Sequence, residues 1–289
     1  MAKRKTRPPL TKKRQTWAEE RGGHTFKGAA LQYPAAPMER YRRELQKMVA
    51  EMTKAYRREL ESVFKQYGPA DTAMDASLPA QARIILAALQ RRFAKLFRDR
   101  APVIADNILN QVDKDSATSL HQSLKELSGG LSLKTKTMPP SLAEAMKAAV
   151  YENVSLIKSI PQQYHTQIEG DVMRSMQPGA NGLQDVYESL RKYEGVTDRR
   201  AKTIAYDQVR KATAALNSER AKAAGVRKFE WVHSGGGAEP RKLHQEFSGQ
   251  IFSYDDLPVI DKKTGERGLP GQLINCRCVA RPVVDFGEE

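Results

Sequence analysis

The apolar residues between Met38 and Tyr67 follow a helical pattern. They recur in steps of three and four, which predicts one apolar stripe along a single helix that ends at Gly68-Pro69. A stripe this narrow suits packing against a neighbouring helix or against another protein chain. Two interpretations therefore stay open for this segment: an ordinary core helix, or a docking surface for a partner. The docking residues would be Leu45, Met48, Met52 and Leu60.

The same period continues, with interruptions, as far as Gly225. Pro102 and Pro161 suit the first turn of a helix, and Ser141 opens a capping box. The polar segment 131–140 predicts a loop and a boundary between helical regions. The predicted helices run from Leu78 to Asp99, from Pro102 to Leu127, from Ser141 to Ile157, from Pro161 to Met176, from Leu183 to Leu190, before Gly195, and from Thr197 to Ala223.

The pattern changes after Gly225. Alternating residues over 229–233 predict a strand, and Pro240 is suited to open a short helix. Residues 274–280 predict a last strand, which Pro282 would end.

The whole pattern predicts a mainly α protein, with an elongated helical N-terminal region followed by a small α+β C-terminal module. The low aromatic content, 7% of 289 residues, agrees with helices built on Ala and Leu. The expected organisation is a basic extended arm over 1–36, a helical region over 37–130, a second helical region over 131–225 that leads into the C-terminal domain, and a strand-containing module over 226–289.

The chain is strongly basic, since 48 Lys and Arg against 34 Asp and Glu give a formal net charge of +14. Such a charge favours a polyanionic partner, with nucleic acid before an anionic membrane surface. No apolar run approaches the roughly 18 residues of a membrane span. No apolar segment follows the basic N-terminus as it would in a secretory signal, so we expect no membrane partner. The two cysteines exclude a disulfide scaffold and fit a reducing compartment.

Half of the net charge lies in the first 30 residues, which hold nine basic and two acidic side chains. Because this segment has no apolar period and contains Pro8-Pro9 and Gly22-Gly23, we predict an arm without a core of its own. The arm either neutralises phosphates of double-stranded DNA or only keeps the protein soluble. The candidate phosphate contacts are Lys3, Arg4, Lys5, Arg7, Lys12, Lys13 and Arg14.

The last third of the chain carries an ordered series of residues. The series is Trp231, Arg241, His244, Gly249, Phe252, Pro270-Gly271 and Asn275-Cys276-Arg277-Cys278. Together with the helix before it, over 200–225, the series resembles the C-terminal domain of phage Mu F-like minor head proteins, the phage head morphogenesis family. The resemblance covers roughly residues 180–285. It implies a low-copy structural protein inside the head, associated with the portal and acting in head assembly or DNA delivery.

Cys276 and Cys278 are candidate metal ligands. Residues two apart on a strand point to one face, with Cα atoms about 6.5 Å apart. This separation is near the upper limit for a mutual disulfide and better suited to a shared metal. The alternative is that both cysteines are small buried hydrophobic residues.

The resemblance to the phage Mu F-like family suggests which residues would join the two cysteines as metal ligands. Many members of the family have Cys-Pro-x-Cys where this chain has Arg241-Lys242-Leu243-His244. His244 therefore stands in the place of one thiolate, and Arg241 in the place of the other, which argues against a four-cysteine site. With His233 on the neighbouring predicted strand, the two cysteines and His244 would form a closed zinc site. Otherwise, His244 packs or makes hydrogen bonds inside the module.

We expect no enzymatic activity, because the sequence holds no glycine-rich phosphate loop and no serine-nucleophile motif. The expected protein is a virion minor capsid protein inside the head, near the portal, and in the host cytoplasm during assembly. Its expected partners are portal protein and packaged double-stranded DNA, with major capsid or scaffolding protein as further candidates. One alternative is a metal-dependent nuclease or toxin-like effector built on His233, His244, Asp255 and Asp256. Another is a cellular nucleic-acid-binding protein.

Overall fold

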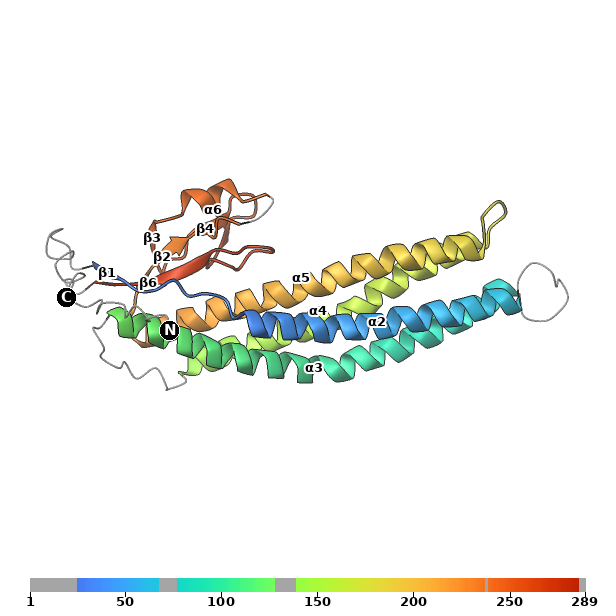
Figure 1. Ribbon diagram of the computed structural model, residues 1–289, viewed down its shortest axis with the longest axis horizontal. Helices are drawn as coiled ribbons and strands as arrows, with labels where there is room; N and C mark the ends of the chain where they lie inside the picture. The colour runs from blue at the N-terminus through green and yellow to red at the C-terminus, as the bar shows by residue number, and fades with distance from the viewer. Residues whose placement is uncertain (1–24, 68–76, 128–138, 237–238, 286–289) are drawn as a thin grey trace, which may run out of the picture. The chain divides into compact units, whose positions relative to one another are not determined.

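The computed structural model describes residues 25–67, 77–127, 139–236 and 239–285. The arm residues from Lys3 to Arg14 and the loop over 131–138 lie outside these ranges. Figure 1 shows long helices followed by a small sheet region, which confirms the predicted fold class. The helices are α2 (Ala35–Gln66), α3 (Leu78–Leu127), α4 (Pro140–Ser175), α5 (Leu183–Ala223) and α6 (Lys242–Glu246). The strands are β1 (Thr25–Lys27), β2 (Lys228–Val232), β3 (Ile251–Ser253), β4 (Val259–Asp261), β5 (Glu266–Arg267) and β6 (Val279–Asp285).

The chain forms two compact units. The first, called here the helical unit, comprises Pro34–Val112 and Glu144–Ala212. The second, the C-terminal unit, comprises Met1–Tyr33, Asp113–Ala143 and Thr213–Glu289. No helix within the described ranges combines the length and the apolarity that crossing a bilayer requires.

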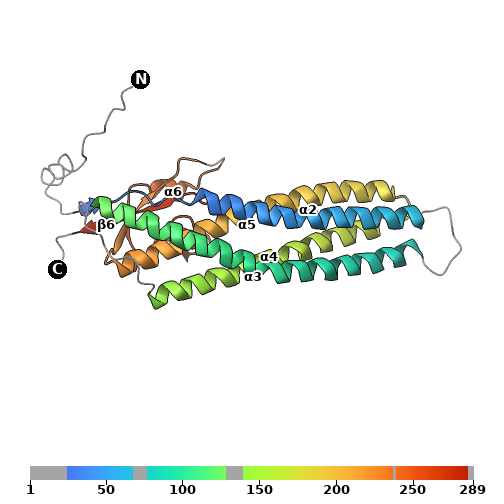
Figure 2. The ribbon, with the colours of Figure 1, turned by 60° about the horizontal axis from the view of Figure 1, so that its bottom comes forward.

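The helical unit is an up-down-up-down bundle of segments of α2, α3, α4 and α5. The Tyr41 hydroxyl bonds Asn153 (2.8 Å) and, further along both helices, the Tyr56 hydroxyl bonds His165 (3.1 Å). Residue numbers therefore rise in the same direction on α2 and α4, so these two helices run parallel. Glu51 meets Arg100 and Tyr56 packs on Phe93, so α2 and α3 run antiparallel. The four long helices lie side by side in both ribbon views (Figures 1 and 2).

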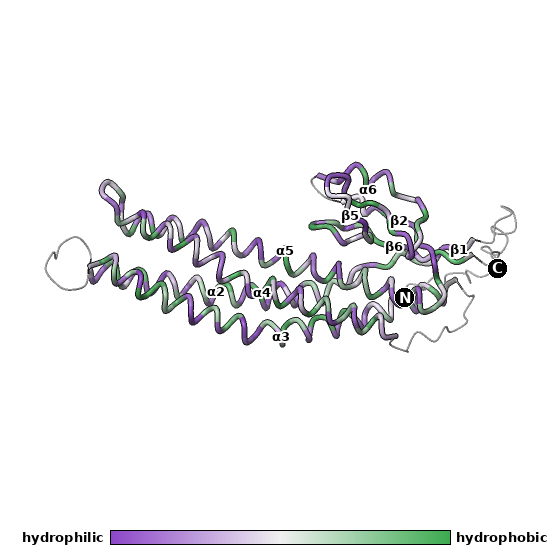
Figure 3. The backbone as a smooth tube through the Cα atoms, turned by 180° about the vertical axis from the view of Figure 1, so that it is seen from behind, coloured by the Kyte–Doolittle hydropathy of each residue, from purple (hydrophilic) through white to green (hydrophobic). Residues whose placement is uncertain are grey.

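The stripe of α2 forms part of the core of this bundle. Leu45, Met48, Met52 and Leu60 are each at most 1% exposed. The interpretation of these four residues as a docking surface is therefore wrong, and the core-helix interpretation is correct. The physical reason is that α3, α4 and α5 supply apolar faces of their own, which the sequence also contains. Figure 3 shows the resulting alternation of hydrophobic and hydrophilic residues along the helices.

Three predicted helix boundaries are wrong, because the helices run through them. Pro102 lies inside α3, Pro161 inside α4 and Gly195 inside α5. An internal proline costs about 3 kcal/mol or more, and an internal glycine about 1 kcal/mol relative to alanine. Packing of residues on both sides of each position offsets these costs, as tertiary contacts commonly do.

The C-terminal unit is built on a four-stranded antiparallel sheet with strand order β1-β6-β2-β3. The predicted strand at 229–233 is confirmed as β2, and the short helix after Pro240 as α6. The predicted extended arm over 1–36 is wrong at its C-terminal end, because Thr25–Lys27 form β1, which pairs with β6, and Leu31 is buried. β1 is only three residues long and pairs with a strand that is distant in sequence, so the residues around it show no periodic pattern that would predict it.

The core of this unit joins the sheet to the ends of two long helices. Phe229 and Trp231 on β2 are fully buried, together with Leu120 on α3 and Ala221 on α5. A polar cluster accompanies the core, in which the Arg220 guanidinium bonds Asp113 and Ser116. The core therefore fixes β2 and the segments beside it, which carry the candidate site.

Candidate metal centre

Two segments bring the candidate ligands together. α6 carries His244, and irregular chain before β6 carries Cys276 and Cys278. The predicted strand over 274–280 is wrong, because β6 begins only at Val279 and the chain turns at Asn275, with φ of 60°. Pro282 does not end β6, since its carbonyl still accepts a hydrogen bond from the Gly28 amide (2.9 Å).

The three donor atoms form a compact buried group, called here the His-Cys-Cys group. His244 Nδ1 lies 3.4 Å from Cys276 Sγ and 3.9 Å from Cys278 Sγ. All three donor atoms lie within 4.8 Å of one another. The side chains are only 2–3% exposed. The structure therefore brings together three of the four candidate ligands, although not through the strand that was expected to hold the two sulfurs.

A backbone carbonyl fixes the tautomer of His244. Its Nε2 lies 3.1 Å from the carbonyl oxygen of Ile260, which can only accept, so Nε2–H is the donor. In the neutral ring, the lone pair of Nδ1 then faces the two sulfurs. The ring itself packs against Trp231, with centroids 5.0 Å apart, and is stacked with Phe247. A carbonyl on the second ring nitrogen is the usual support of a metal-bound histidine.

The surroundings of the sulfurs favour a thiolate. The neighbouring thiol of Cys278 lowers the pKa of Cys276, helped by backbone N–H groups, while burial opposes the effect. The same contact, with burial, raises the pKa of Cys278. The Gly271 amide also donates to Cys276 Sγ (3.4 Å). Among the described residues, the buried indole N–H of Trp231 has no hydrogen-bond partner, and its proximity to Cys278 offsets only part of the rise in the pKa of that thiol.

The dimensions of the His-Cys-Cys group fit a tetrahedral zinc ion. Zinc bonds of about 2.3 Å to sulfur and 2.0–2.1 Å to nitrogen place neighbouring ligand atoms about 3.6–3.8 Å apart. The N–S distances of 3.4 and 3.9 Å lie on either side of this range, and the two sulfurs lie within 4.8 Å of each other. Zinc held here would tie α6 to the segment before β6 and would neutralise the thiolates. The residues present therefore fit the metal, and the packing explanation remains the alternative.

The other predicted site residues lie apart from this group. His233 borders the same cavity, but its Nδ1 accepts a hydrogen bond from the Gly235 amide (3.1 Å). Asp255 pairs with Arg227 (3.4 Å), and Asp256 pairs with Arg267 (2.7 Å), both on the surface. The carboxylates suggested for a nuclease centre are thus not gathered around His244 in the described chain.

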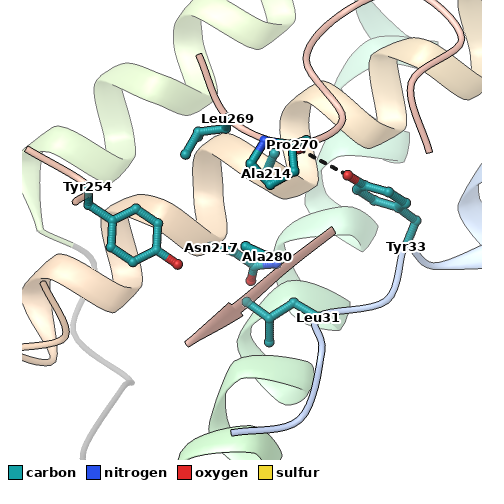
Figure 4. Close-up of a pocket in the computed structure, with 8 residues that line it drawn as sticks. All are labelled: Leu31, Tyr33, Ala214, Asn217, Tyr254, Leu269, Pro270 and Ala280. Carbon is teal, nitrogen blue, oxygen red and sulfur yellow. Dashed lines mark hydrogen bonds between the residues drawn. The ribbon is translucent and has the colours of Figure 1, made fainter. Parts of the chain in front are cut away.

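Tyr33 supports the cysteine-bearing segment and was missed by sequence reasoning. Its hydroxyl donates to the Cys278 carbonyl (2.5 Å) and lies 3.1 Å from the carbonyl of Pro270. The second contact and a small pocket around it appear in Figure 4. Gly271, at φ of 90°, lets the chain pass close to the Tyr33 ring, where a Cβ would collide. Nothing in the local sequence around Tyr33 indicates a contact 245 residues away.

Comparisons with known proteins agree with this region of the fold. The model of the Phage Mu protein F like family matches residues 166–281. An uncharacterized protein of Haemophilus influenzae is 30% identical over 251 residues, covering 86% of this chain and 54% of that protein. The uncharacterized protein YqbB of Bacillus subtilis is 26% identical over 204 residues, covering 65% of this chain and 62% of that protein. No solved structure matches the chain.

This chain therefore spans between about half and three fifths of the length of these two relatives. The family match, in contrast, takes in α5, β2, α6 and the whole His-Cys-Cys group. It agrees with the ordered series of residues found in the sequence. Residues 166–281 of this chain thus match the Phage Mu protein F like family, the family that the ordered series resembles.

Proposed function

We propose that this protein is a low-copy structural component of a phage head, bound to portal protein and to packaged double-stranded DNA. The observation that carries the proposal is the family match over residues 166–281. The net charge of +14 supports a polyanionic partner. A structural rather than catalytic role is favoured because Asp255 and Asp256 are engaged in surface ion pairs.

We further propose that zinc is a structural element of the C-terminal unit. The His-Cys-Cys group joins α6 to the chain before β6, two short segments with few backbone bonds of their own. A metal that crosslinks such segments stabilises the folded state directly, since the unfolded chain offers no preformed site.

The portal partnership predicts that the protein co-purifies with portal protein and is present in heads. Affinity capture of the tagged, full-length protein from infected or induced cells, followed by mass spectrometry, should recover portal protein. Quantification in purified heads should give far fewer copies than for the major capsid protein. Absence of the protein from both immature and mature particles would contradict the proposed function as a whole.

The basic arm predicts a salt-dependent contribution to DNA binding. Replacing Lys3, Arg4, Lys5, Arg7, Lys12, Lys13 and Arg14 with Gln keeps the chain length and leaves β1 intact. Each lost phosphate contact should reduce the slope of log K against log salt by about 0.9 for duplex DNA. The slope is measured by fluorescence anisotropy over a salt series. Gln at Lys147 and Lys158, on α4, is the control and should leave the slope nearly unchanged. An unchanged slope in the arm variant would mean that the arm does not contact phosphates.

A further inference from the structure

The His-Cys-Cys group borders an open cavity with cationic walls. The cavity has a volume of about 570 Å³, and its lining includes all three members of the group. Arg241, Arg277 and Ile274 are further parts of the lining, as are His233 and Glu239. A buried ligand group is therefore reachable from solvent through a polar opening.

The described chain provides three ligands where zinc commonly takes four. Arg241 stands directly before α6 and lines the same cavity as His244. Its guanidinium cannot ligate a cation, and it donates instead to the Ile274 carbonyl (3.0 Å). His233 stays outside the group of three. The fourth coordination position is thus left to a ligand that enters through the cavity.

The basic side chains that line the cavity favour a negatively charged ligand. Arg241 and Arg277 are both exposed, and neither makes an ion pair with another residue of the described ranges. Two guanidinium groups beside a metal favour an oxyanion, which they can hold through charge-assisted hydrogen bonds. Ile274, at 61% exposed, adds an apolar neighbour. An apolar contact next to the cations suits an acidic side chain on a protein better than the phosphate of DNA.

We propose that the metal centre takes its fourth ligand from a partner protein, as a carboxylate held by Arg241 and Arg277. This inference rests on the proposed zinc site. Carboxylate oxygen is a regular zinc ligand beside Cys and His, at about 2.0–2.2 Å. The metal then serves both to fix the module and to join it to an acidic partner.

The test uses the full-length protein loaded with Co²⁺, whose visible spectrum reports its ligands. Titration with acetate should shift the bands to a saturable end point, with one Co²⁺ bound per chain. Replacing both Arg241 and Arg277 with Ala should weaken acetate binding about tenfold or more, because the charged donors are lost. Arg227→Ala is the matched control, since this exposed arginine of the same unit pairs with Asp255, and it should leave the titration unchanged.

A second variant supplies the fourth metal ligand from the chain itself. Arg241→Cys places a thiol at the residue before α6, in the lining of the cavity that His244 also borders. It should strengthen the sulfur-to-cobalt absorption and abolish the response to acetate while the protein stays folded.

The remaining outcomes separate the two proposals. Failure to bind Co²⁺ or Zn²⁺ at all would overturn the metal centre itself. Stoichiometric Co²⁺ with no response to acetate would overturn the external ligand alone. A change in the acetate-free spectrum of His233→Ala or Glu239→Ala would instead identify a fourth ligand within the chain. Saturation by inorganic phosphate at far lower concentration than by acetate would overturn the choice of a carboxylate.

Discussion

Met52→Asp is expected to unfold the protein at room temperature. Met52 is fully buried in the helical unit, among the apolar residues of α2. An unpaired carboxylate placed there costs several kcal/mol, either as desolvation of the charge or as a raised pKa. Because single domains are stable by only about 5–15 kcal/mol, one such change consumes most of the free energy of unfolding. Far-UV circular dichroism and thermal melting measure the loss.

Lys54→Asp is the matched control for this substitution. Lys54 lies two residues further along α2 and is exposed, so the same new side chain meets water. Its effect should stay within about 0.5 kcal/mol, as is usual for surface positions. A folded Met52→Asp variant with near-normal melting would show that this face of α2 is open to solvent or to a partner, contrary to the structure.

Removing the metal is expected to have the second large effect. Purified protein should hold close to one zinc per chain, and a chelator should lower the melting temperature of the C-terminal unit. Structural zinc contributes about 10–16 kcal/mol in small zinc-finger peptides. The effect here should be smaller, because Phe229 and Trp231 give the unit a hydrophobic core of its own. Calorimetry with and without chelator, together with metal analysis, measures both quantities.

Single substitutions identify the ligands that hold the zinc. His244→Ala and Cys276→Ser should each lower the zinc content and the melting temperature, since each removes one of three protein ligands. His233→Ala should keep one zinc per chain, because His233 lies outside the group. Metal-free protein with unchanged stability would leave the packing of two buried cysteines as the explanation for the group.

The sequence was informative where local patterns decide the structure. The apolar period on α2 is helical, and its boundaries are close to those of the helix. It could not distinguish a core helix from a docking helix, because both need the same stripe. Pro102 and Pro161 were misleading, since the rule that places proline in the first turn ignores packing from neighbouring helices.

Three of the four candidate ligands could be found from the sequence, but the way the chain gathers them could not. The series ending in Cys276 and Cys278, together with His244, identified the metal-ligand candidates from spacing and resemblance. The turn at Asn275 and the support from Tyr33 depend on long-range contacts, for which the sequence carries no periodic signal. His233 was grouped with the ligands because it lies at the end of β2, whereas its ring nitrogen is engaged by the Gly235 amide.

The pairing of β1 with β6 has a consequence for how this chain can be made and divided. Thr25 pairs with Asp285, so the sheet is complete only when both of these distant segments are present. On the ribosome, β1 stays without its partner until β6 has been made, which makes this pairing a high-contact-order step. A fragment cut to the family match, 166–281, would lack β1 and part of β6. Its β6 would become an open edge, available for pairing with other copies and for aggregation.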